Sequence, residues 1–89
     1  MIACVTGEVA ERRPEHVVID CGGVGYRLQV SAKTLAKVPA RGNATLLTHL
    51  VVRDDGMHLY GFATEQERDL FLMLISVAGV GPKMALAVL

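Results

Sequence analysis

Short apolar and β-branched runs, separated by glycine-containing turns, fill much of the first sixty residues, and one of them alternates apolar and polar side chains with the period of two of a β-strand. This is the run over residues 24–30, in which every second residue is apolar. Gly22-Gly23 before it and Asp55-Gly56 later in the chain are both hairpin-turn pairs. The pattern predicts five strands, over residues 2–10, 16–21, 24–30, 45–52 and 57–62.

One short helix interrupts this series of strands. Ser31 is a suitable N-cap for a helix over residues 32–38, which Pro39 would end. The predicted order is therefore β-β-β-α-β-β, the layout of a five-stranded OB-fold barrel. An SH3-like barrel is the nearest alternative. The chain as a whole is expected to be mainly β at first and then α.

The period changes to that of a helix after Phe62. Thr64 followed by Glu67 forms a capping-box signature, and Gly79 is a natural residue to end the helix that starts there. Pro82 suits the first position of another helix, which runs to Leu89 without a stop signal. We therefore expect a boundary near Ala63, a barrel over residues 1–63, and over residues 64–89 the start of a helical domain in a longer protein.

The segment Gly79-Val80-Gly81-Pro82-Lys83 could bind a phosphate. Two glycines let the backbone approach a ligand closely, and the next helix presents free N–H groups and the positive end of its dipole. Lys83 would add a counter-charge. Contact with the nucleic-acid backbone alone would not depend on base sequence. The alternative is a plain turn between two helices.

Other candidate chemistry is weaker. Asp54 and Asp55 could belong to a metal-dependent nuclease, but two-metal cleavage needs more converging carboxylates, and adjacent acids in a turn commonly form a solvated loop. His16, His49 and His58 fall in different predicted strands, which gives little reason to expect a metal site. No G-x-x-x-x-G-K-[ST] motif occurs, so no nucleotide cofactor is expected and any ATP would be used by a partner.

A generic OB-fold protein that binds single-stranded DNA would show exposed aromatic platforms and a basic groove. The nine basic and nine acidic residues cancel, so no global positive field attracts nucleic acid. The large apolar residues that could serve as platforms are instead expected in the core, with three methionines as core filler: Tyr26, Tyr60, Phe62, Met57, Met73 and Met84.

Composition places the chain among ordinary folded proteins, because hydrophobic residues make up 52% of its 89 residues. Cys4 and Cys21 have no partner at metal-ligand spacing and are expected to be buried free thiols. The sequence contains neither a signal peptide nor an apolar run long enough to cross a membrane. We therefore expect a cytoplasmic protein that makes no membrane contact.

Four segments, in register along the whole chain, resemble the RuvA family, whose members bind Holliday junctions within the bacterial RuvAB branch-migration complex. They are Gly22-Gly23-Val24-Gly25-Tyr26, Val51-Val52-Arg53-Asp54-Asp55, Leu59-Tyr60-Gly61-Phe62 and Gly79-Val80-Gly81-Pro82-Lys83. One departure is Asp54, which stands where glutamate is expected in relatives and shortens the reach of one carboxylate.

The resemblance implies a homotetramer, possibly an octamer, with the barrel at the centre of a four-way junction and tandem helix-hairpin-helix motifs on the DNA arms. Asp54 and Asp55 would form an acidic pin, whereas Arg53, Gly79, Val80, Gly81 and Lys83 would contact DNA. The subunit would not be an enzyme by itself. It would act with the RuvB ATPase, through a carboxy-terminal domain beyond Leu89, and with the RuvC resolvase in recombination, DNA repair and the SOS response to DNA damage.

Overall fold

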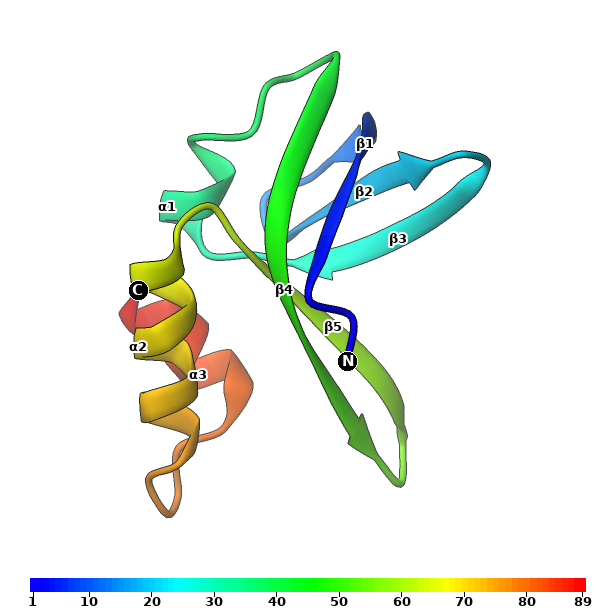
Figure 1. Cartoon of the computed structure of the whole chain (residues 1–89). Helices are drawn as coiled ribbons and strands as arrows, with labels where there is room; N and C mark the ends of the chain where they lie inside the picture. Colours follow the sequence, from blue (N-terminus) through cyan, green and yellow to red (C-terminus); the bar gives the residue numbers. More distant parts are fainter.

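A computed structural model describes all 89 residues of the chain, and Figure 1 shows its course. Five strands form a closed barrel in the order β1-β2-β3-β5-β4. Every neighbouring pair is antiparallel except β3 and β5, which run parallel where Gln29 lies opposite Tyr60. The strands are β1 (Cys4–Arg12), β2 (His16–Cys21), β3 (Val24–Gln29), β4 (Asn43–Arg53) and β5 (Gly56–Phe62). With α1 (Ala32–Leu35) between β3 and β4, this confirms the OB-fold prediction.

The barrel encloses an aliphatic core. Alternate residues of its strands point inward, as the period of two predicts. The hairpin between β2 and β3 turns at Gly22 and Gly23, whose φ angles of 64° and 100° favour glycine. Eight buried side chains fill the interior: Val5, Val9, Val17, Ile19, Leu28, Val30, Val38 and Leu46.

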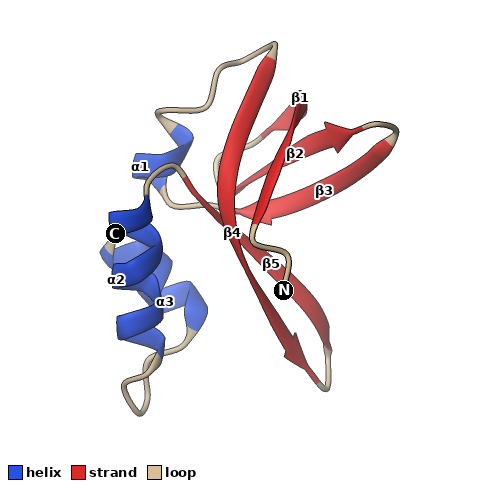
Figure 2. Ribbon diagram, viewed as in Figure 1, coloured by secondary structure: helices blue, strands red, loops and turns tan.

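Two helices follow the barrel, α2 (Glu65–Ile75) and α3 (Pro82–Val88) (Figure 2). A second apolar cluster joins them to β5, and its buried members are Tyr60, Phe62, Phe71 and Ala85. The Phe71 ring of α2 lies 5.1 Å from the Tyr60 ring and 5.0 Å from the Phe62 ring. The helices therefore share a core with the outer side of the barrel. Neither helix is long enough to cross a membrane.

Several local predictions are wrong in detail. Helix α1 ends at Leu35 rather than residue 38, and α2 ends at Ile75 rather than at Gly79. Ser76 and Val77 donate their N–H groups to the carbonyls of Met73 and Leu74, and these i to i−3 bonds tighten the last turn before Gly79 is reached.

The predicted burial of the methionines and of Cys4 is also wrong. Met57, Met73 and Met84 are exposed, and so is Cys4, whereas Cys21 is half-buried. The β4–β5 ribbon extends past the barrel, so Met57 near its tip has no core to enter (Figure 1). Met73 and Met84 are exposed residues of α2 and α3. Periodicity identifies apolar positions but does not tell which of them find a partner.

Candidate nucleic-acid interface

The loop between α2 and α3 exposes backbone at the start of a helix. Gly79 has a φ of 84°, and nothing lies within 4 Å of where a Cβ would stand at Gly79 or Gly81. Gly81 is the N-cap of α3 without a side-chain hydrogen bond, so the first N–H groups of the helix have no capping side chain. Val80 differs from its neighbours, because it is half-buried against the second apolar cluster and anchors the loop.

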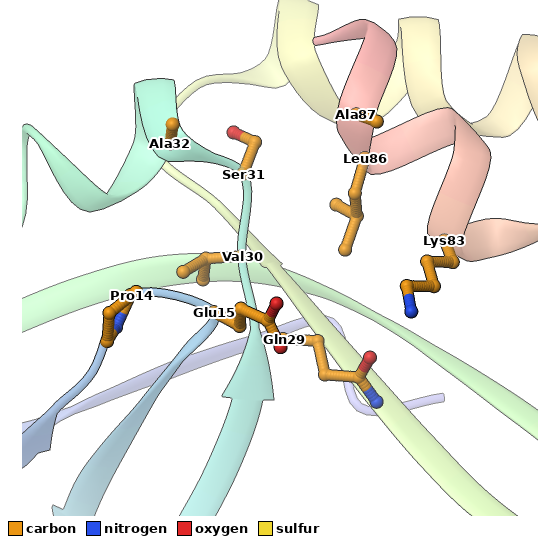
Figure 3. Close-up of a pocket in the computed structure, with 9 residues that line it drawn as sticks. All are labelled: Pro14, Glu15, Gln29, Val30, Ser31, Ala32, Lys83, Leu86 and Ala87. Carbon is orange, nitrogen blue, oxygen red and sulfur yellow. The ribbon is translucent and has the colours of Figure 1, made fainter.

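Lys83 extends from α3 beside a cleft of about 350 Å³ between this helix and the barrel (Figure 3). Glu15 and Gln29 line the opposite wall. The lysine is exposed and has no carboxylate within ion-pair distance. Its charge is therefore available to an anion at the mouth of the cleft.

The acidic turn lies at the tip of the β4–β5 ribbon. Arg53 and Gly56 are paired across the ribbon, and Asp54 and Asp55 form the exposed turn between them. His58 places its Nε2 atom 3.3 Å from Asp55 Oδ1. Figure 1 shows this turn and the α2–α3 loop as two separate projections, so the fold does not merge the predicted site residues into one pocket.

Comparison with known proteins identifies the family. A family model described as the RuvA N terminal domain matches residues 1–61. This chain belongs to the RuvA family. Three relatives bear the name Holliday junction branch migration complex subunit RuvA, and each match covers 100% of this chain. The relative from Alkalilimnicola ehrlichii is 56% identical over 90 residues, which are 43% of its length. That from Delftia acidovorans is 51% identical over 90 residues and 47% of its length. That from Mycobacterium tuberculosis H37Ra is 52% identical over 89 residues and 45% of its length. The chain thus spans less than half the length of these relatives.

The histidines of this RuvA-family chain do not converge. His16 bonds to Glu11 at 2.8 Å, His49 packs edge-on against Phe71, and His58 lies beside Asp55. No three His, Cys, Asp or Glu side chains gather in a group that could hold a metal ion. No third carboxylate, histidine or cysteine therefore lies close enough to Asp54 and Asp55 to complete a metal site with them.

Sequence reasoning missed a cleft with both polar and apolar walls on the barrel of the RuvA-family chain. This second cleft, lined in part by Arg27, Met57 and His58, runs beside β3 and β5. Gln29 lines this cleft and also the cleft at Lys83, so the two clefts lie on either side of one residue. Arg27 and Gln29 are the polar residues next to Leu28 in the alternating run, but only the closure of β3 against β5 brings them beside Met57 and His58.

Burial around Phe71 shifts two pKa values. Burial raises the pKa of the Tyr60 hydroxyl above its usual range. Burial, aided by the charge of the N-terminal ammonium, lowers the pKa of His49 below its usual 6.5. Both groups contact Phe71, so the interface between α2 and the barrel favours neutral side chains.

Proposed function

We propose that this RuvA-family chain is the amino-terminal part of a Holliday junction-binding subunit, which recognises DNA and catalyses no reaction itself. The observation that carries the proposal is the exposed loop over residues 79–83, which presents uncapped helical N–H groups beside the free charge of Lys83. It occurs in a chain more than half identical to relatives named as branch migration subunits.

The loop forms the first helix-hairpin-helix contact of the subunit, within a helical part that begins at residue 64. Gly79 and Gly81 have open space where side chains would stand, so a phosphate can approach the backbone. Val80 holds the loop in place, and Lys83 supplies charge. These contacts read the DNA backbone and not its sequence.

The acidic turn acts as a pin at the junction centre. Asp54 and Asp55 are exposed at the end of a projecting ribbon, where their charges repel phosphates and guide separating strands. Arg53, exposed at the base of the turn, contacts the DNA backbone. A separated strand then passes from the pin toward Lys83, across the two neighbouring clefts that Gln29 lines.

The full-length subunit works as a homotetramer whose barrels meet at the centre. One face of the β4–β5 ribbon supports this arrangement, because the cross-strand neighbours Val52 and Met57 are 68% and 73% exposed. Apolar side chains exposed side by side in this way favour contact with another protein surface. The tetramer acts with the RuvB ATPase as motor and with the RuvC resolvase, in the cytoplasm, during recombination and repair.

A gel-shift experiment with the full-length protein tests this function. We expect a retarded complex with a four-way junction in Mg²⁺, with the DNA left intact and with weaker binding to linear duplex. Cleavage that disappears in Asp55→Asn would instead indicate a metal-dependent nuclease. Equal affinity for poly-dT and for the junction would indicate a generic single-strand binder, and either result would reject the proposal.

The variant Lys83→Ala tests the role of the loop. We expect it to weaken binding to all junction sequences similarly and to lower the slope of log K against log salt by about one unit per hairpin engaged. The control is Lys33→Ala, which removes an exposed lysine of α1. Unchanged binding by Lys83→Ala, or an equal loss in the control, would contradict the assignment.

A further inference from the structure

Glu67 is a buried acidic residue that takes no part in the proposed DNA contacts. It lies in the first turn of α2 and is only 5% exposed. The capping box predicts that its carboxylate returns to the Thr64 backbone N–H. Instead, Thr64 Oγ1 accepts the Glu67 N–H and donates to Oε1, at 3.2 Å in each case. The second oxygen remains free for a partner outside the helix.

That partner is Thr34 of α1, in the barrel. Thr34 is fully buried, and its hydroxyl donates to Glu67 Oε2 at 2.8 Å while accepting the Ala63 N–H at 3.2 Å. Ser31 fixes this residue in turn, because its Oγ accepts the Thr34 N–H at 3.1 Å. The Nζ atom of Lys37, which follows α1, lies 3.6 Å from Glu67 Oε1. One threonine hydroxyl thus connects α1, the segment after β5, and α2.

The geometry of α2 gives this connection a mechanical consequence. Glu67 and Phe71 are four residues apart and contact the barrel from the same face of the helix. The hydrophobic burial of Phe71 is non-directional, whereas hydrogen bonds to Glu67 restrict both distance and angle. The 11-residue helix is about 16 Å long, so a tilt of about 10° at its start moves its far end by about 3 Å. A shift of this size equals the length of a hydrogen bond, so it is enough to break contacts made by the loop at that end.

We propose that Glu67 is a positioning residue that, through Thr34, sets the angle between the barrel and the α2–α3 loop. This inference rests on the proposed function, since the angle matters when barrel and loop engage the same junction. A single duplex arm needs only the loop. Loss of the Thr34–Glu67 bond should therefore weaken binding to the junction more than it weakens binding to a single duplex.

The test compares Thr34→Val and Thr34→Ser in the full-length protein. Valine has nearly the same shape but no hydroxyl, whereas serine restores it. The control is Thr48→Val, because Thr48 is a buried threonine of β4 whose hydroxyl donates to the Ile2 carbonyl, within the barrel. Thermal unfolding shows which variants are folded at the assay temperature.

We expect Thr34→Val to lower the ratio of junction affinity to duplex affinity by about tenfold, the equivalent of one charge-assisted hydrogen bond. Thr34→Ser and Thr48→Val should keep the wild-type ratio. Amide hydrogen exchange without DNA should speed up at residues 63–67 in Thr34→Val only. An unchanged ratio and unchanged exchange in Thr34→Val, or an equal loss of preference in Thr48→Val, would overturn the inference. A wild-type protein without junction preference would reject the proposed function, while hydrogen exchange would still test the coupling.

Discussion

Gly7 lies where the barrel leaves no room for a side chain. It lies in β1, which pairs with β2 on one side and with β4 on the other. A Cβ atom at this position would stand 2.8 Å from the carbonyl carbon of Asp20, and the obstacle is backbone rather than a flexible side chain. The close approach of β1 and β2 therefore depends on the absence of a side chain.

Replacing this residue, Gly7→Ala, should lower the free energy of unfolding by about 1–3 kcal/mol, because the strands must separate to admit the methyl group. Denaturant unfolding measures the change. The matched control is Gly81→Ala, where the added Cβ meets nothing within 4 Å, so only the weaker N-cap preference of alanine is felt and the loss should be smaller than at Gly7. Equal stabilities of the two variants would contradict the close approach.

His49 makes stability depend on pH. Burial lowers its pKa below the usual 6.5, so the unfolded chain binds more protons than the folded one just below that pH. The free energy of unfolding should therefore fall as pH decreases from about 7.5 to 5.5. Glu11 acts in a lower range, because the hydrogen bond from His16 lowers its pKa below 4.5 and its contribution is lost only under more acidic conditions.

Thermal unfolding between pH 8 and pH 5.5, for the wild type and for His49→Gln, checks this prediction. The wild-type Tm should fall with pH across this interval, and the fall should be smaller in the variant, whose side chain does not titrate. An identical pH dependence in the two proteins would show that His49 is not the group responsible.

At the level of elements, the β4–β5 ribbon and the α2–α3 hairpin, which we propose to contact DNA, present chemically different surfaces. The ribbon ends in two aspartates, and the hairpin ends in glycines and a lysine. The ribbon is held by the antiparallel ladder between β4 and β5, and α2 by Phe71 and Glu67. Because α2 packs on Tyr60 and Phe62 of β5 and not on the turn at Asp54 and Asp55, changes at the ribbon tip should leave the helices folded.

Neutralising the ribbon tip with Asp54→Asn and Asp55→Asn tests the pin. We expect junction affinity to stay equal or rise, since repulsion of phosphates is removed, while motor-driven branch migration changes in rate. The control variant, Glu8→Gln with Asp69→Asn, changes the net charge equally at other exposed sites. Binding titrations and a strand-exchange assay measure the two effects. A large loss of junction affinity in the pin variant would reject the repulsive role.

At the level of the whole molecule, burial is uneven. The barrel has a complete interior, and the helices share a second cluster with β5. Exposed apolar residues remain on the ribbon at Val52 and Met57, and on the helices at Met73 and Met84. The ribbon pair lies beside the proposed pin, so the same symmetric contact would gather the pins and cover the apolar surface.

The mass of the full-length protein in solution tests this arrangement. Light scattering should give four chains per particle for the wild type and fewer for Val52→Glu with Met57→Glu, because the substitutions place charge on the proposed contact. Val24→Glu, at another exposed apolar position, should keep the wild-type mass. A monomeric wild type would reject the tetramer, and an unaffected double variant would place its interface elsewhere.

Much of the fold follows from signals local in sequence. The alternation over residues 24–30, the glycine pair before it and the Thr64 cap each depend on neighbours a few residues away, so the strands, their hairpins and the start of α2 could be predicted. The Gly79–Lys83 loop could be identified for the same reason. The role of the acidic turn could not, because nothing near Asp54 distinguishes a pin from a solvated loop, and only the family resemblance suggested one.

The tertiary structure decided what depends on residues far apart in the chain. Parallel contact of β3 with β5 at Gln29 places this residue on the walls of two clefts, and the ribbon's extension past the barrel exposes Met57. Thr34 and Glu67, 33 residues apart, meet only when α1 packs beside the start of α2. The sequence by itself determined where elements begin and turn, because backbone preferences are local. Which side chains meet or stay exposed was decided by the closure of the barrel.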